Sequence, residues 1–140
     1  MTDTARLIRT VAAVITDGDG RVLVVRKHGS TTFIQPGGKR DAGEDSLATL
    51  ARELHEELGV VLDKASARRL GEFQAAAVNE PGCTVSGEAF LVQVTGTPVA
   101  AAEIAELAWI PLDPPPGVPL APLSRQHILP AARASLAGAG

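Results

Sequence analysis

Apolar residues follow a two-residue or continuous pattern in several short stretches, which is typical of β-strands. Two such stretches, residues 8–16 and 21–28, are separated by Asp17-Gly18-Asp19-Gly20. Apolar strands on either side of a Gly/Asp turn predict a β-hairpin. Residues 69–78, 88–95 and 106–110 predict three further strands.

One internal segment instead has the spacing of a helix with a buried face. Its apolar residues recur at three- and four-residue intervals: Leu47, Leu50, Ala51, Leu54 and Leu58. Glu44 and Asp45 favour a helix N-terminus here, Ser46 is the candidate N-cap, and Gly59 supplies the C-terminal stop.

The C-terminal part predicts a loop followed by a helix. Residues 113–122 contain five of the ten prolines and predict an extended surface loop. Residues 124–137 predict a helix, in which Pro130 either introduces a kink or starts a second helix. Together these elements predict an α/β fold (α+β, with a mixed sheet), and we expect one domain over residues 1–140.

Composition narrows the class of protein. The chain is 45% apolar and 21% charged, which excludes a disordered protein. Its net charge of -3 offers no basic surface for a nucleic-acid polymer. The single Cys83 excludes an internal disulfide, and no apolar run reaches the ~18 residues that span a membrane. We therefore expect a cytoplasmic protein, either monomeric or homodimeric.

Three glutamates share one wall of the predicted helix. At about 100° per residue, Glu56, Glu53 and Glu57 lie roughly 180°, 240° and 280° from Leu47, away from the leucine face. Such a wall is either a solvated acidic surface or a carboxylate cluster for a hard divalent cation. Gly37-Gly38, just before the helix, could add a backbone carbonyl to a metal site.

The whole stretch from Gly38 to Val60 resembles the Nudix box. The matching residues are Gly38, Glu44, Arg52-Glu53-Leu54, Glu56-Glu57, Leu58 and Gly59, at the spacing of the box. This resemblance implies an α/β/α sandwich in which the box forms a loop–helix–loop. It also implies Mg²⁺-dependent hydrolysis (Mn²⁺ being a substitute ion) of a nucleoside diphosphate linked to another group.

The same resemblance implies roles for individual residues. The metal ligands would be Gly37 or Gly38 through a carbonyl, and Glu53, Glu56 and Glu57. Arg52 would orient the glutamates, and Glu44 would support the loop. For the general base, Glu53 or Glu56 is the first candidate, and Glu103, in a loop before Trp109, is the second.

Substrate-binding residues lie outside the box. Strand alternation directs either Arg26 or Lys27 toward the phosphates, and we select Arg26. The other candidates are Phe33 for stacking, Lys39 for phosphate, and Asn79 for a base edge.

Three classes of function remain open. The first is a MutT-like pyrophosphohydrolase of a nucleoside triphosphate or of its oxidised form. An enzyme alternative is hydrolysis of ADP-ribose, another nucleotide sugar or a dinucleoside polyphosphate. Outside enzymes, the alternatives are a non-catalytic nucleotide-sensing module and a structural protein with an acidic helix.

Overall fold

The computed structural model describes residues 6–78 and 80–138. It contains six strands, two α-helices and one π-helical segment, η1. In chain order these are β1 (Arg6–Ile15), β2 (Arg21–Lys27), β3 (Gly37–Lys39), α1 (Ser46–Leu58), β4 (Val61–Ala76), β5 (Cys83–Thr95), β6 (Ile104–Pro111), η1 (Leu123–Ile128) and α2 (Leu129–Gly138).

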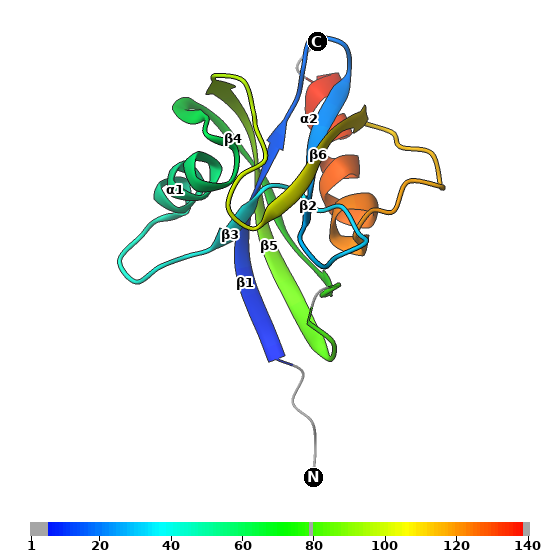
Figure 1. Ribbon diagram of the computed structural model, residues 1–140. Coiled ribbons are helices and arrows are strands. Elements are labelled where there is room, and N and C mark those ends of the chain that lie inside the picture. Colours follow the sequence, from blue (N-terminus) through cyan, green and yellow to red (C-terminus); the bar gives the residue numbers. More distant parts are fainter. Residues whose placement is uncertain (1–5, 79, 139–140) are drawn as a thin grey trace.

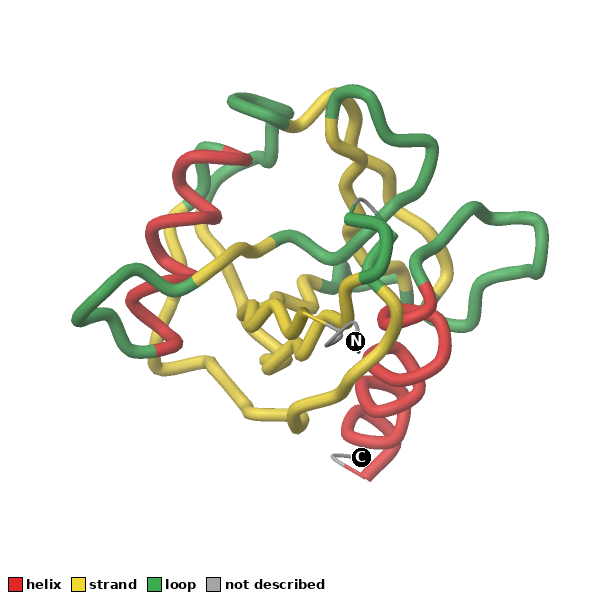
Figure 2. Tube along the Cα trace, turned by 90° about the horizontal axis from the view of Figure 1, so that it is seen from below, coloured by secondary structure: helices red, strands yellow, loops and turns green. Residues whose placement is uncertain are grey.

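The strands form two sheets between two helical layers. Four strands lie in the order β3-β1-β5-β4, while β2 and β6 form a separate antiparallel pair. The β1–β5 pair is parallel and its neighbours are antiparallel, so the larger sheet is mixed. Helix α1 lies on one side of the strands, and η1 with α2 lies on the other (Figure 1). The view from below shows the same separation (Figure 2). The mixed α/β fold is confirmed.

The predicted hairpin between the first two strands is wrong. After the turn, only a single bridge, Thr16 to Val22, joins the two strands. Strand β1 instead pairs with β3 and β5, and β2 pairs with β6. The reason is that β1 is buried on both faces from Val11 to Ile15, so it must be covered on both sides. A continuous apolar run of this kind is typical of a central strand with a parallel neighbour.

Other boundaries differ less from the prediction. Strands β4 and β5 begin earlier than expected, and two bulges interrupt their ladder near Arg68 and Gly71. The proline-rich stretch is a loop, as predicted, and the Arg125 guanidinium donates hydrogen bonds to its carbonyls at Pro114, Pro115 and Val118. Pro130 is the second residue of α2. In the described part of the chain, no helix is long and apolar enough to cross a membrane.

Both ends of helix α1 are defined by capping residues. Its N-cap is Asp45, whose carboxylate accepts a hydrogen bond from the Ala48 N–H at 2.8 Å. The candidate cap Ser46 is the first residue of the helix, and its hydroxyl instead donates to Glu88. Gly59 ends the helix in the left-handed conformation, with φ 70°.

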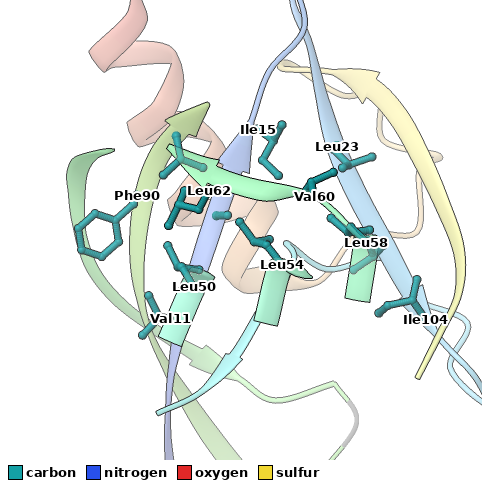
Figure 3. Close-up of a cluster of buried hydrophobic side chains, with 13 residues drawn as sticks. Val11, Ile15, Leu23, Leu50, Leu54, Leu58, Val60, Leu62, Phe90 and Ile104 are labelled. Carbon is teal, nitrogen blue, oxygen red and sulfur yellow. The ribbon is translucent and has the colours of Figure 1, made fainter. Parts of the chain in front are cut away.

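Two apolar clusters lie on opposite faces of the larger sheet. The first joins α1 to the sheet through Leu50, Leu54 and Leu58, which point toward Val11, Ile15 and other strand residues (Figure 3). The second lies beneath η1 and α2 and includes Ile128 and Leu129. Because the first cluster fixes α1 against the sheet, it also fixes the direction of the polar residues of that helix.

Substitution of Leu54 tests how strongly the packing of α1 against the sheet contributes to the stability of the fold. Leu54 is fully buried, so Leu54→Ala should lower the free energy of unfolding by about 2–5 kcal/mol in urea titrations. Val61→Ala is the control, because Val61 is 61% exposed and its truncation should change stability by less than about 0.5 kcal/mol. Equal losses in the two variants would show that α1 does not depend on its leucine face.

Candidate active site

The three glutamates of the predicted acidic wall occupy different environments. Glu53 and Glu57 are buried, with exposed fractions of 8% and 2%, whereas the Glu56 side chain is 52% exposed. The Gly37 N–H donates to Glu57 Oε1 at 3.4 Å. Two of the carboxylates therefore face the short edge strand β3, and only Glu56 resembles a solvated surface charge.

The two glycines before the box helix are required for different reasons. A Cβ on Gly38 would lie 2.2 Å from Glu53 Oε2, so the carboxylate occupies the space that a side chain would need. Gly37 has φ 147°, and a Cβ there would lie 2.0 Å from the backbone oxygen of Val11. The lack of a side chain at Gly38 thus leaves room for the Glu53 carboxylate. At Gly37 it leaves room for the backbone of β1.

Burial changes the acidity of both carboxylates. It raises the pKa of Glu57 to about 8, and the charge of Glu53 acts in the same direction. Burial also raises the pKa of Glu53, against the opposing effect of Arg52. Two adjacent carboxyl groups that are costly to ionise are suited to a divalent cation, which would compensate their charge.

The donor set is of the kind that a hard divalent cation uses. Among the described residues, no three His, Cys, Asp or Glu side chains gather into a ready-made metal cluster. Magnesium commonly uses one or two carboxylates and completes its shell with water and substrate phosphates. The Glu53–Glu57 pair, with the adjoining backbone of Gly37 and Gly38, provides ligands of that kind.

Arg52 connects the elements around this pair. Its Nε and Nη2 donate to the two carboxylate oxygens of Glu44 at 2.7 and 2.9 Å, and Nη2 also donates to the Lys39 carbonyl at 3.1 Å. Its Nη1 lies 3.5 Å from Glu53 and 3.7 Å from Glu56. Arg52 therefore links the loop before α1, the end of β3 and the glutamates of the helix.

A cavity of about 520 Å³ opens beside the carboxylates. Its charged lining residues include Lys27, Lys39, Glu53, Glu80 and Glu103, and the Lys39 ammonium lies 3.7 Å from the Glu80 carboxylate. Its apolar lining residues include Ile8, Ala76, Val85, Leu123 and Ile128. This volume is within the range of small-molecule sites.

The structure separates the substrate-binding candidates. Lys39 lines the cavity, but Arg26 does not: it donates to Glu106 at 3.0 Å and to the Ser30 carbonyl at 2.9 Å. Lys27 lines the cavity in place of Arg26. It follows Leu23 and Val25 along β2, whose side chains pack in the same cluster as the α1 leucines, so ordinary strand alternation gives Lys27 this face.

The remaining candidates differ in their placement. Glu103 lines the cavity, and its carboxylate lies 3.9 Å from the Lys27 ammonium. Phe33 packs against the second apolar cluster and is not among the cavity-lining residues. Asn79 lies outside the described residues. Two further lining residues, Gln35 and Ser124, are buried polar side chains that the sequence analysis did not single out.

Comparison with known proteins places the chain in a family. Residues 6–130 match the family model of the NUDIX domain. The chain belongs to the Nudix family. The box residues described above are therefore the Nudix box of this chain.

The relatives agree in fold. The solution structure of the E. coli ORF135 protein superimposes with a TM-score of 0.76 and 29% identity, covering 96% of this chain and 94% of that one. The MutT NUDIX hydrolase from Burkholderia pseudomallei gives a TM-score of 0.72 and 26% identity, covering 86% and 95%. The α/β/α arrangement expected from the Nudix resemblance is thereby confirmed.

A curated relative carries a more specific name. A 60-residue segment is 37% identical to the 8-oxo-dGTP diphosphatase of Haemophilus influenzae and covers 40% of this chain and 44% of that protein. The chain thus spans less than half the length of this relative in the match.

The two glycines allow a matched pair of variants. Gly38→Ala should displace the Glu53 carboxylate, which is the end of a side chain that can move, and so weaken Mg²⁺ binding by about tenfold or more while leaving the melting temperature nearly unchanged. Gly37→Ala should instead lower the melting temperature, because its Cβ meets backbone. Calorimetric Mg²⁺ titration and thermal melts separate the two effects. Unchanged Mg²⁺ affinity in Gly38→Ala would contradict this assignment.

The lowered pKa of Glu44 predicts that the protein loses stability in acid. Hydrogen bonds from Arg52, and then from the Asp41 N–H and the Thr49 hydroxyl, lower the pKa of Glu44 from 4.5 to about 2. Its stabilisation is therefore complete above pH 4.5 and is lost as the pH falls toward 2. The stability difference between wild type and Glu44→Gln should be constant from pH 7 to 5 and shrink below that, in urea titrations. A difference that stays constant down to pH 3 would argue against this pairing.

Proposed function

We propose that the chain, as one Nudix domain over residues 1–140, is a cytoplasmic MutT-like pyrophosphohydrolase. Its substrate would be a nucleoside triphosphate or an oxidised form of one. The observation that carries the proposal is the buried Glu53–Glu57 pair, of which Glu53 lines a cavity with both charged and apolar residues in its lining. The name of the Haemophilus influenzae relative supports an oxidised purine nucleotide as substrate.

The metal would be held by side chains of α1 and by the glycine backbone beside them. Glu53 and Glu57 are the main proposed ligands, Gly37 or Gly38 adds a carbonyl, and the exposed Glu56 completes the set from the outer side of the helix. When bound, Mg²⁺ or Mn²⁺ would neutralise phosphate charge and make the attacking water more acidic. Arg52 positions Glu53 through its Nη1, 3.5 Å from that carboxylate.

Other charged residues of the lining would bind the phosphates and move the proton. Lys27 and Lys39 both line the cavity, beside Glu103 and Glu80, and would supply positive charge for a triphosphate. Glu53 is the first candidate for the general base because it lines the cavity, whereas Glu56 does not. Glu103, which also lines the cavity, is the second candidate.

This function can be tested in the presence of Mg²⁺ with a panel of nucleoside triphosphates to which ADP-ribose is added. Wild type should release pyrophosphate and a nucleoside monophosphate. Glu53→Gln and Glu57→Gln should each lower kcat/KM by about 10²–10⁴-fold, the range expected for loss of a catalytic carboxylate. The control is Glu106→Gln, because Glu106 pairs with Arg26 and does not line the cavity.

The outcomes separate the classes of function. Full activity in both Gln variants would overturn the role of the buried pair. If no compound of the panel, ADP-ribose included, were hydrolysed while nucleotides still raised the melting temperature, the nucleotide-sensing alternative would replace the enzyme.

A further inference from the structure

One buried polar atom beside the cavity has no role in the site described so far. Gln35 is only 6% exposed, and its Nε2 donates to the Ala13 carbonyl at 3.2 Å. Its Oε1 is buried and has no hydrogen-bond partner among the described residues. Buried side-chain oxygens are nearly always paired, because an unpaired acceptor has lost its water without a replacement.

The backbone on both sides of Gln35 is fixed by hydrogen bonds. Ile34 exchanges two of them with Val25, at 2.8 and 2.9 Å, and the Pro36 carbonyl accepts one from the Ala13 N–H at 2.8 Å. The side-chain amide is itself anchored to Ala13. The acceptor is therefore held in place before any ligand arrives.

The chemistry of this position selects a donor. Gln35 lines the same cavity as the buried carboxylate of Glu53. Phosphate oxygens accept hydrogen bonds and cannot satisfy another acceptor. The lysines that suit phosphates, Lys27 and Lys39, also line this cavity. Around Gln35 the lining also includes apolar side chains, namely Ala12, Ile34, Ala121 and Ile128. An apolar lining with one acceptor suits a planar ring that carries an N–H on its edge.

We propose that Gln35 Oε1 accepts a hydrogen bond from an N–H of the substrate's nucleobase and thereby determines which nucleotides are hydrolysed. This assignment rests on the proposed function, since it takes the triphosphate to lie beside Glu53 with the base against the apolar lining residues. Gln35 is a specificity-determining residue in this proposal, and it takes no part in the bond cleavage.

The test compares deoxynucleoside triphosphates whose bases differ in their N–H donors. Two pairs differ by one amino group: dATP with the analogue lacking the 6-amino group, and dGTP with dITP. In the third pair, 8-oxo-dGTP with dGTP, the oxidised base gains the N7–H together with the C8 oxygen. Wild type should favour the donor-bearing member of at least one pair by about tenfold or more in kcat/KM. Gln35→Met, which keeps the length and removes the acceptor, should bring that ratio close to one, mainly through KM. Gln93→Met, at an exposed position, should retain the wild-type ratio.

A second measurement is independent of hydrolysis. Calorimetry with the matching nucleoside monophosphates, without metal, should show the same loss of preference in Gln35→Met. If Gln35→Met does not fold, Gln35→Asn serves in both assays. Its side chain is one methylene shorter, so the amide oxygen lies farther from the base.

Each result decides between the alternatives. Equal ratios in wild type and Gln35→Met would overturn the proposal and leave a bound water as the partner of Oε1. A change confined to the comparison of ribose with deoxyribose would overturn it in favour of a sugar hydroxyl. If wild type hydrolysed no triphosphate, the proposed function would fail, and the monophosphate binding alone would decide the role of Gln35.

Discussion

The arrangement of the site depends on the burial of two carboxylates against the glycines of β3. Glu53 and Glu57 are adjacent on one helix face, and both are removed from water. Such a pair is unfavourable without a cation, as the raised pKa of Glu57, about 8, reflects. The surrounding structure must therefore hold it in place. The leucines of the same helix do so, because their packing against the sheet leaves α1 no freedom to turn the glutamates into solvent.

Helix α1 thus serves stability and chemistry with different faces. Its leucine face contributes to the core, and its glutamate face contacts β3. Arg52 extends between the two halves of the box by pairing with Glu44. The caps at Asp45 and Gly59 fix where the helix begins and ends. A shift of one residue along the helix would place either Leu54 and Leu58 beside the glycines or, in the other direction, Glu53 and Glu57 in the core. Burying two adjacent carboxylates lowers the stability of the fold locally. Active sites commonly accept a loss of this kind, which the remaining fold must offset.

The parts of the fold that the sequence predicted correctly are those governed by local spacing. The helix over residues 46–58 follows from the leucine period, and the box follows from the order of its residues. The burial of Glu53 and Glu57 could not be read from the helical wheel, because the wheel does not show that β3 covers that wall. Strand pairing also depends on partners that are distant in the sequence. The turn at Asp17 therefore suggested that β1 pairs with β2, whereas β1 pairs with β5 and β2 pairs with β6.

The placement of single side chains was hardest to predict. The choice between Arg26 and Lys27 required knowing which face of β2 lies toward α1. Leu23 and Val25 occupy that face, and Lys27 continues it. In the sequence, Gln35 is marked only as a polar residue just before Pro36-Gly37-Gly38. That its oxygen is buried without a partner follows from the packing of β1 beside it. Both residues depend on contacts between segments far apart in the sequence.

The lining of the cavity limits how this protein can distinguish one base from another. No aromatic side chain occurs among the lining residues of the described part of the chain, so stacking on an aromatic ring does not contribute there. Affinity must then come mainly from the phosphates, through the lysines and the metal, and these contacts are the same for every nucleoside triphosphate. Apolar walls reject a base only by its shape and discriminate weakly between bases of similar size. Selection among bases therefore falls to the few buried polar groups of the lining, of which Gln35 is the one with an unused acceptor.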